Sequence, residues 1–252
     1  IPELDMSSYA GNQEVQEAVI DTVTYLQDHH KYHDMSMPQH LLFSGPPGTG
    51  KTYLAKAIAG HCAVPLISRN ASSIHKSHIG ETESQMRELF QLAQSACPCV
   101  LLIDEFDALA PIRRPENANQ GSWIITMVNQ LLGLLENKQH GVVFIATTNK
   151  VEHCDPAVLR SGRFDRHIVI RHPNEQTRLA ILEKQLEKVG MPCDVKLRVL
   201  VKLTRGFDAA KTTALIDNAY LIATKHKAKT IKYFHVELAK RAISTGLLNS
   251  LP

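Results

Sequence analysis

The sequence of 252 residues has few aromatic residues, little excess charge and no long apolar run. Aromatic side chains make up 6% of the residues, with a single Trp, and the formal net charge at pH 7 is only +3. With no basic helix and no aromatic stacking module, this composition argues against a nucleic-acid partner. No apolar run approaches the ~18 residues that a membrane-spanning helix needs, and no signal-peptide pattern is present. We therefore expect neither nucleic-acid binding nor a membrane span in this chain.

Paired cysteines are also missing. The five cysteines are an odd number, lie scattered along the chain and form no CxxC pair. This pattern favours reduced thiols and a cytoplasmic location. The chain begins with Ile1 rather than Met, which is consistent with an excised fragment. If a membrane anchor lies outside it, we expect a cytosol-facing location.

Histidine, in contrast, is abundant, with thirteen residues in the chain. The run "HHKYH" at 29–33 raises the possibility of a metal site. It follows a predicted helix in a polar stretch, and no fourth ligand is nearby in the sequence. We therefore interpret this run as a solvated surface rather than a zinc site.

Apolar runs and helical patterns alternate along the first two thirds of the chain. Apolar runs that predict strands lie at 40–45, 64–72, 99–110, 141–149 and 167–172, and helical spacing is present at 12–28 and 83–96. This alternation predicts a parallel sheet covered by helices on both faces. After Pro173 the pattern is helical throughout. We expect an α/β nucleotide-binding domain over 1–172 and a small all-helical lid domain over 173–252.

A loop rich in glycine and proline, "SGPPGTGKT", follows the first strand. Its spacing Gly45-x-x-x-x-Gly50-Lys51-Thr52 fits the phosphate-binding loop, whose backbone N–H groups cradle phosphates at a helix N-terminus. In this interpretation Lys51 contacts the β- and γ-phosphates and the Thr52 hydroxyl binds Mg²⁺. The alternative is an ordinary turn between strand and helix. The loop predicts a P-loop NTPase fold, with candidate binding residues Pro47, Gly48, Thr49, Gly50, Lys51, Thr52 and Tyr53.

Acidic residues end the predicted strand "VLLID". Asp104 and Glu105 lie at its carboxyl end, the edge of an open α/β sheet at which ligands bind. An Asp at this position can hold Mg²⁺, and the adjacent Glu105 can polarise an attacking water. A strand that simply ends in solvated acids is the alternative. We expect Asp107 to be structural.

Asn149 follows the strand "VVFIATT" and can bind the γ-phosphate or the water, although turn-forming Asn residues are also common at strand ends. The following run contains Arg160, Arg163 and Arg166 before the fifth strand. These arginines can form a solvated edge, or they can supply an arginine finger to the γ-phosphate of a neighbouring subunit.

Together these motifs resemble the AAA family of ring ATPases along essentially the whole chain. "GPPGTGKT" resembles its Walker A motif, "LLIDEFDALAP" its Walker B motif and "ATTN" its sensor 1. "TNKVEHCDPAVLRSGRFDR" resembles the second region of homology, the most specific of these motifs. "IDEFDALAPIRR" is similar to valosin-containing protein and "DTVTYLQD" to FtsH-type proteases.

The resemblance implies a role for each matched residue. Lys51, Thr52 and Asp104 would bind ATP and Mg²⁺, Glu105 would activate water, and Asn149 would sense the γ-phosphate. Arg163 and Arg166 would act in trans, which implies a ring, usually a hexamer. The positions that resemble contacts to the base, ribose and lid are Tyr9, Ala10, Ile181, Gln185, Ala209 and Ala210.

Three positions depart from the family pattern. Ala10 replaces a usual glycine, which puts the base contact in question. Lys211 replaces an acid near the phosphates and is either a cationic sensor or a solvent-facing lysine. His78-Ile79-Gly80 occupies the place of the pore loop, where an aromatic residue usually precedes the aliphatic one.

Three functions are compatible with these residues. The first is a ring motor that uses ATP hydrolysis to remodel a protein substrate. The second is a nucleotide-switched assembly or adaptor module that threads nothing. The third is the motor half of an ATP-dependent protease, whose HExxH zinc site would lie outside this chain, since no His-Glu pair occurs in it.

Overall fold

The computed structural model describes residues 1–32, 37–74, 81–112, 118–160 and 162–245, without the side chains of 118–124. The predicted pore-loop residues His78, Ile79 and Gly80 lie outside these ranges. Contacts divide the chain into two units. One comprises Ile1–Met6, Gln13–Pro46 and Lys51–Ile170, and the other comprises Ser7–Asn12, Pro47–Gly50 and Arg171–Pro252. The division at 172/173 expected from the sequence stays a prediction.

The first unit contains a parallel five-stranded sheet, as expected. Its strands pair in the order β2-β3-β4-β1-β5. The strands are β1 (His40–Ser44), β2 (Leu66–Asn70), β3 (Cys99–Asp104), β4 (Val142–Thr148) and β5 (Arg166–Val169). Strand β3 ends at Asp104, earlier than the sequence pattern indicated, because the short 3-10 helix η3 (Phe106–Ala108) follows.

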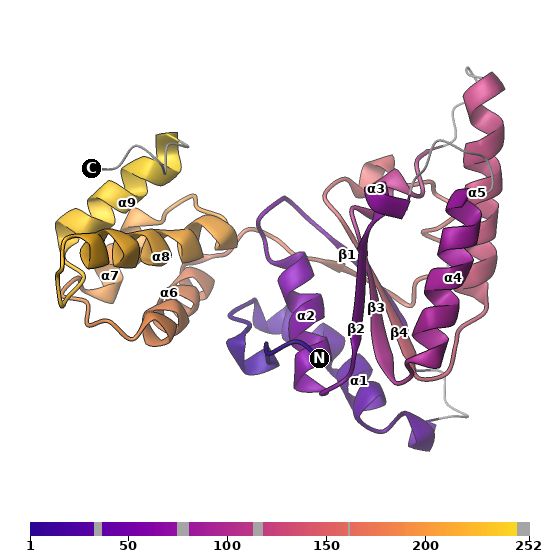
Figure 1. Cartoon of the computed structure of the whole chain (residues 1–252), viewed down its shortest axis with the longest axis horizontal. Coiled ribbons are helices and arrows are strands. Elements are labelled where there is room, and N and C mark those ends of the chain that lie inside the picture. Colours follow the sequence, from indigo (N-terminus) through magenta and orange to yellow (C-terminus); the bar gives the residue numbers. More distant parts are fainter. Residues whose placement is uncertain (33–36, 75–80, 113–117, 161, 246–252) are drawn as a thin grey trace. The chain divides into compact units, whose positions relative to one another are not determined.

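Helices cover both faces of this sheet, which explains why the central strands are continuously apolar. Figure 1 shows α1 (Gln13–Gln27) and α2 (Lys51–His61) on one side and α4 (Glu81–Ser95) and α5 (Ala118–Glu136) on the other. The short helix α3 (Ala71–Ile74) follows β2. The residues Val100–Ile103 of β3 and Val143–Ala146 of β4 are fully buried. Helices α3 and α5 are not among the elements that the sequence pattern predicted.

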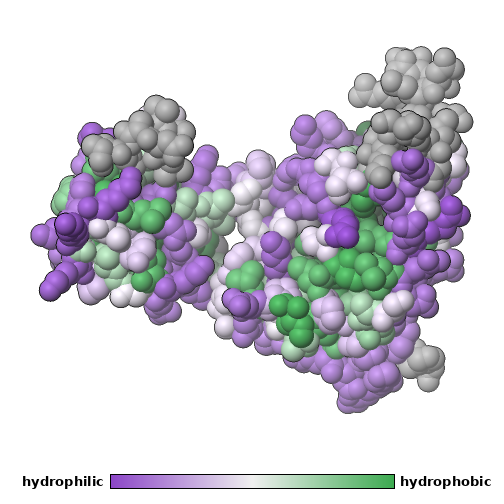
Figure 2. Space-filling view, viewed as in Figure 1, coloured by the Kyte–Doolittle hydropathy of each residue, from purple (hydrophilic) through white to green (hydrophobic). Residues whose placement is uncertain are grey.

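Strand β2 lies at one edge of the sheet and is less buried than the central strands. Figure 2 shows apolar residues gathered on the face of this unit where β2 lies in Figure 1. Among the described helices, none combines the length and the apolar character that crossing a membrane requires.

The second unit is helical, with α6 (Glu175–Val189), α7 (Leu197–Leu203), α8 (Ala209–Lys225) and α9 (Tyr233–Thr245). Its core is separate and includes Leu182, Leu215 and Val236, all fully buried. The Asn174 side chain caps α6 by accepting a hydrogen bond from the Thr177 N–H. Within its described residues this unit contains no strand beyond an isolated bridge.

Candidate active site

The predicted phosphate loop connects β1 directly to the N-terminus of α2. Three of its glycines have positive φ, at 143° for Gly45, 74° for Gly48 and 95° for Gly50, a conformation that other residues rarely adopt. At Gly45, an added Cβ would lie 2.0 Å from the carbonyl oxygen of Ile170. The sequence therefore needs glycine at Gly45 both for its backbone angle and for the close approach of another strand end.

Lys51 is the first residue of α2 and is only 7% exposed. Its Nζ donates hydrogen bonds to the carbonyl oxygens of Gly45, at 2.8 Å, and Pro46, at 2.7 Å. Burial lowers the pKa of this ammonium, and the nearby Asp104 carboxylate opposes that shift. The cation is thus held at the loop, in a position from which it can bind an anion at the helix N-terminus.

The two predicted metal ligands are in direct contact. The Thr52 hydroxyl donates a hydrogen bond to Asp104 Oδ2 at 2.8 Å, and the Thr147 hydroxyl donates to the other carboxylate oxygen. A hydroxyl and a carboxylate are oxygen ligands of the kind that Mg²⁺ prefers. The residues present therefore fit a magnesium ion bound beside the phosphate loop.

Glu105 follows β3 in a left-handed conformation, with φ 56° and ψ 45°, which is uncommon for a residue other than glycine. Its Oε2 accepts a hydrogen bond from Asn70 Nδ2 at 2.8 Å. Asn70 is the last residue of β2 and pairs in register with Asp104. Sequence reasoning missed Asn70, although a polar residue at a strand's carboxyl end is the same signal that identified the acids.

Asn149 is exposed and directly follows β4, the strand that lies between β3 and β1. Because all three strands are parallel, this carboxyl edge carries the phosphate loop, the Asn and the two acids. Asp107 accepts a hydrogen bond from the Thr148 hydroxyl at 2.7 Å. That contact agrees with the structural role expected for Asp107.

The two arginines predicted to act in trans contact residues of their own chain. Arg163 donates to the Ala157 carbonyl oxygen and to Glu136 Oε1, both at 2.8 Å. Arg166 bonds to the Ala18 carbonyl oxygen at 2.5 Å and pairs with Asp21. The structure therefore does not bring these guanidinium groups to the phosphate loop of the same chain.

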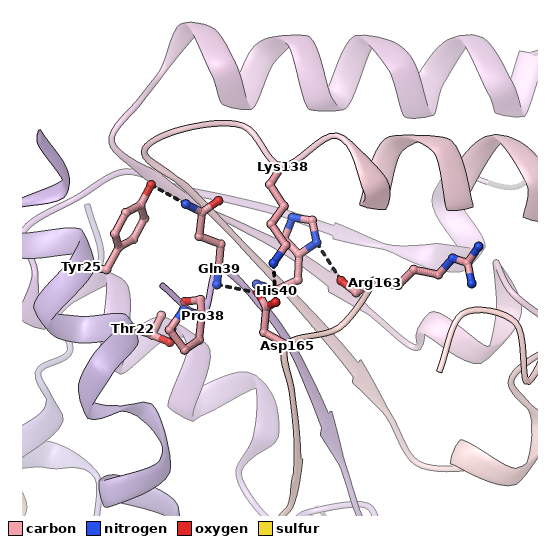
Figure 3. A network of polar contacts seen from close by, with 8 residues as sticks. All are labelled: Thr22, Tyr25, Pro38, Gln39, His40, Lys138, Arg163 and Asp165. Atoms are coloured by element: carbon pink, nitrogen blue, oxygen red, sulfur yellow. Dashed lines mark hydrogen bonds and ion pairs between the residues drawn. The ribbon is translucent and has the colours of Figure 1, made fainter. Parts of the chain in front are cut away.

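A polar network at the opposite, amino edge of the sheet positions this arginine segment (Figure 3). Asp165 accepts hydrogen bonds from the backbone N–H groups of Gln39 and His40, each at 2.9 Å, and pairs with Lys138. His40 Nδ1 lies 2.9 Å from the Arg163 carbonyl oxygen. Burial alone would raise the pKa of Asp165, but the hydrogen bonds from Lys138, His40 and Gln39 lower it.

The candidate base contacts belong to the second unit. Tyr9 is buried, and burial raises its pKa to about 12. The Lys184 ammonium, on α6, bonds to the carbonyl oxygen of Ser7 and lies 3.3 Å from that of Tyr9. The neighbouring α6 residue Gln185 is buried and donates to Asp217 on α8. The remaining candidates are Ala10 and Ile181, which are half-buried.

The lid run at the start of α8 contacts the glycine loop within the same unit. The Ala210 N–H donates to the Gly48 carbonyl oxygen at 3.0 Å, and Ala209 precedes it as the first residue of α8. Lys211 is exposed, and its Nζ lies 3.7 Å from Asp208 Oδ2. This exposed contact favours the solvent-facing interpretation of Lys211.

A phosphate loop beside a hydroxyl–carboxylate pair, on the carboxyl edge of a parallel sheet, defines a P-loop nucleoside triphosphatase. Residues 41–172 match the family described as "ATPase family associated with various cellular activities (AAA)". The chain belongs to this AAA family, as the motifs indicated, and it uses ATP with Mg²⁺.

The chain is also similar to bacterial proteins named ATP-dependent zinc metalloprotease FtsH. It is 34% identical to the one from Helicobacter felis over 98% of this chain and 39% of the relative. It is 38% identical to one from Aster yellows witches'-broom phytoplasma over 95% of this chain and 36% of the relative. It is 37% identical to FtsH 3 of Symbiobacterium thermophilum over 94% of this chain and 38% of the relative. The chain thus spans less than two fifths of the length of these relatives.

Proposed function

We propose that this chain is the ATP-hydrolysing part of a ring motor that unfolds protein substrates for an attached or associated protease. The supporting observation is that the similarity to ATP-dependent proteases extends over 94% to 98% of this chain. Because the chain itself contains no HExxH pattern, the peptidase of such a machine would lie outside it. The motor would work on the cytoplasmic side, on protein substrates.

In this proposal the carboxyl edge of the sheet divides the chemistry among its residues. Lys51 and the loop amides bind the β- and γ-phosphates, and Thr52 and Asp104 hold the magnesium ion that neutralises their charge. Glu105 orients the attacking water and accepts its proton. Asn149 binds the γ-phosphate or the water. The contact from Asn70 would hold the Glu105 carboxylate at the sheet edge.

We further propose that the subunits form a ring, with six as the expected number, and share catalysis. Arg163 and Arg166 would stabilise the γ-phosphate bound by the neighbouring subunit. Both guanidinium groups now contact residues of their own chain, such as Glu136 and Asp21. Assembly would therefore require these arginines to exchange partners. The proposed base and ribose contacts are Tyr9, Ala10, Ile181, Gln185, Ala209 and Ala210.

The first test separates ATP binding from hydrolysis in the purified chain. Lys51→Ala should lose ATP binding, because it removes the ammonium that contacts the phosphates. Glu105→Gln should retain ATP and lower turnover by about 10²–10⁴-fold, the usual contribution of a general base. Glu152→Gln, which changes an exposed carboxylate outside the site, is the matched control and should hydrolyse at the parent rate. Turnover at the parent rate in Glu105→Gln would show that another group activates the water.

The second test concerns the protein substrate. An unfolded protein such as casein should stimulate the ATPase of the assembled ring, and the Glu105→Gln ring should bind it without responding. A demonstrably assembled ring with unchanged turnover would contradict the motor proposal. In that case the nucleotide-switched assembly module would be the better explanation.

A further inference from the structure

Three histidines that are far apart in the sequence meet at the amino edge of the sheet. His29 and His30 lie in the 3-10 helix η2 (His29–Tyr32), directly after α1, and His140 lies just before β4. One ring nitrogen from each histidine lies within 4.8 Å of the corresponding nitrogen of the other two. The ring centroids are 4.0 Å apart for His29 and His30 and 5.3 Å apart for His29 and His140.

The limit of 4.8 Å on these nitrogen separations is wider than the spacing around a bound zinc ion, so the rings would move closer to hold one. Zinc binds imidazole nitrogens at about 2.0–2.1 Å in a tetrahedral arrangement, which places ligand nitrogens about 3.3 Å from one another. His30 is exposed, so its side chain can adjust by the remaining distance. Three imidazoles with a fourth position left for water form the donor set of open zinc sites, whereas closed structural sites have four protein ligands.

The surrounding residues hold two of the three rings in place. His29 is only 7% exposed. A Cβ added at Gly141 would lie 3.0 Å from its Cδ2 atom and 2.1 Å from Cys97 Sγ, so only glycine allows the chain to pass this close.

Tyr25 orients the third ring. Its hydroxyl lies 3.4 Å from His140 Nδ1. That hydroxyl is itself fixed, because it accepts hydrogen bonds from Gln39 Nε2 and from the Gly141 N–H, both at 2.7 Å. The Tyr25 hydroxyl thus links the His140 ring to the residues that precede β1 and β4.

We propose that His29, His30 and His140 bind one zinc ion, or a similar divalent transition metal, which joins the end of α1 to the start of β4. The ion would take no part in ATP hydrolysis, because the phosphate loop and the acids lie at the opposite edge of the sheet. It would therefore stabilise the α/β unit and leave ATP hydrolysis unchanged. The magnesium ion bound with ATP is a different ion at a different place.

The test uses the full chain, freed of metals with a chelator and supplied with excess Mg²⁺ and ATP. Calorimetric titration with zinc chloride should show one ion per chain. Zinc at about 100 times its dissociation constant should raise the Tm by roughly 5–10 °C. Cobalt(II), used in place of zinc, should give the visible absorption of a four-coordinate ion.

Variants of the three ligands decide the outcome. His30→Gln changes an exposed side chain and should fold normally, yet bind zinc at least tenfold more weakly; His140→Gln should do the same. His172→Gln, which changes an exposed histidine elsewhere, is the matched control and should bind as the parent does. Absence of binding in the parent, or equal affinity in His30→Gln and the parent, would overturn the proposal.

Discussion

Replacing Tyr25 with Phe tests how the amino edge of the sheet is held together. Tyr25 is fully buried in α1, and its hydroxyl accepts one hydrogen bond from Gln39, just before β1, and one from Gly141, just before β4. Phe keeps the packed ring but leaves two buried N–H donors without an acceptor. Each such donor costs about 1–3 kcal/mol. Because the Gln39 side chain can partly relax, we expect a loss of about 2–4 kcal/mol in the free energy of unfolding.

The assay is thermal unfolding followed by circular dichroism, in the chain without added metal. For a domain of this size the loss corresponds to a Tm lower by roughly 5–15 °C in the transition of the α/β unit. Tyr233→Phe is the control, because that ring is 51% exposed on α9 and its change should alter stability by less than about 0.5 kcal/mol. The ATPase rate per folded molecule should stay the same. If Tyr25→Phe is as stable as Tyr233→Phe, the two hydrogen bonds do not hold the strand starts together.

Three further predictions concern assembly, pH and substrate. Mixing inactive Lys51→Ala with inactive Arg163→Ala should restore part of the ATPase activity, because some interfaces then join an intact loop to an intact finger. Mixed rings without recovery would indicate that Arg163 acts in cis or only supports the structure. The urea concentration at the midpoint of unfolding should be lower at about pH 5.5 than at about pH 7.5. Burial lowers the pKa of His40, so the unfolded chain binds more protons than the folded chain below about pH 6.5. Asp165 acts in the same direction at lower pH: its lowered pKa stabilises the fold above the unfolded value, and this contribution is lost only below the range of His40. A constant midpoint above pH 5.5 would contradict the His40 argument. In the ring, His78→Tyr should raise protein-stimulated ATPase and His78→Ala should lower it, because imidazole offers less contact area than an aromatic ring; three equal rates would exclude substrate contact at His78.

The sheet and the phosphate loop were predictable because their signals are local. A strand buried on both faces must be apolar throughout, as Val100–Ile103 and Val143–Ala146 are. A loop that turns through positive φ at Gly45 and Gly50 needs glycine there. Helix α5 was also accessible, since "MVNQLLGLLE" repeats apolar residues at helical spacing. The sequence analysis did not predict it, although Asn117, a residue type that favours helix N-caps, directly precedes Ala118.

The partners of the site residues were not predictable, because strand order determines them. The residues around "SRN" at the end of β2 give no sign that β2 pairs with β3. It is this strand pairing that brings Asn70 into contact with Glu105. The left-handed backbone of Glu105 is equally hidden, because a glutamate gives no signal for it. Such contacts become predictable once the sheet order is known, since polar residues that end neighbouring parallel strands must then be neighbours.

The same reasoning applies to the amino edge, where the sequence interpretation of the histidines was incomplete. His29 and His30 follow a helix whose chain must return to start β1, so they lie at the edge where every strand begins. His140 precedes β4 by two residues and therefore lies at that edge too, although 110 positions separate it from His30. Sequence distance hid His140 as a further ligand, whereas the parallel sheet, by aligning all strand starts, brings it close to His29 and His30. A search for metal ligands in parallel α/β proteins should therefore compare the residues that precede each strand, and not only those that are close in sequence.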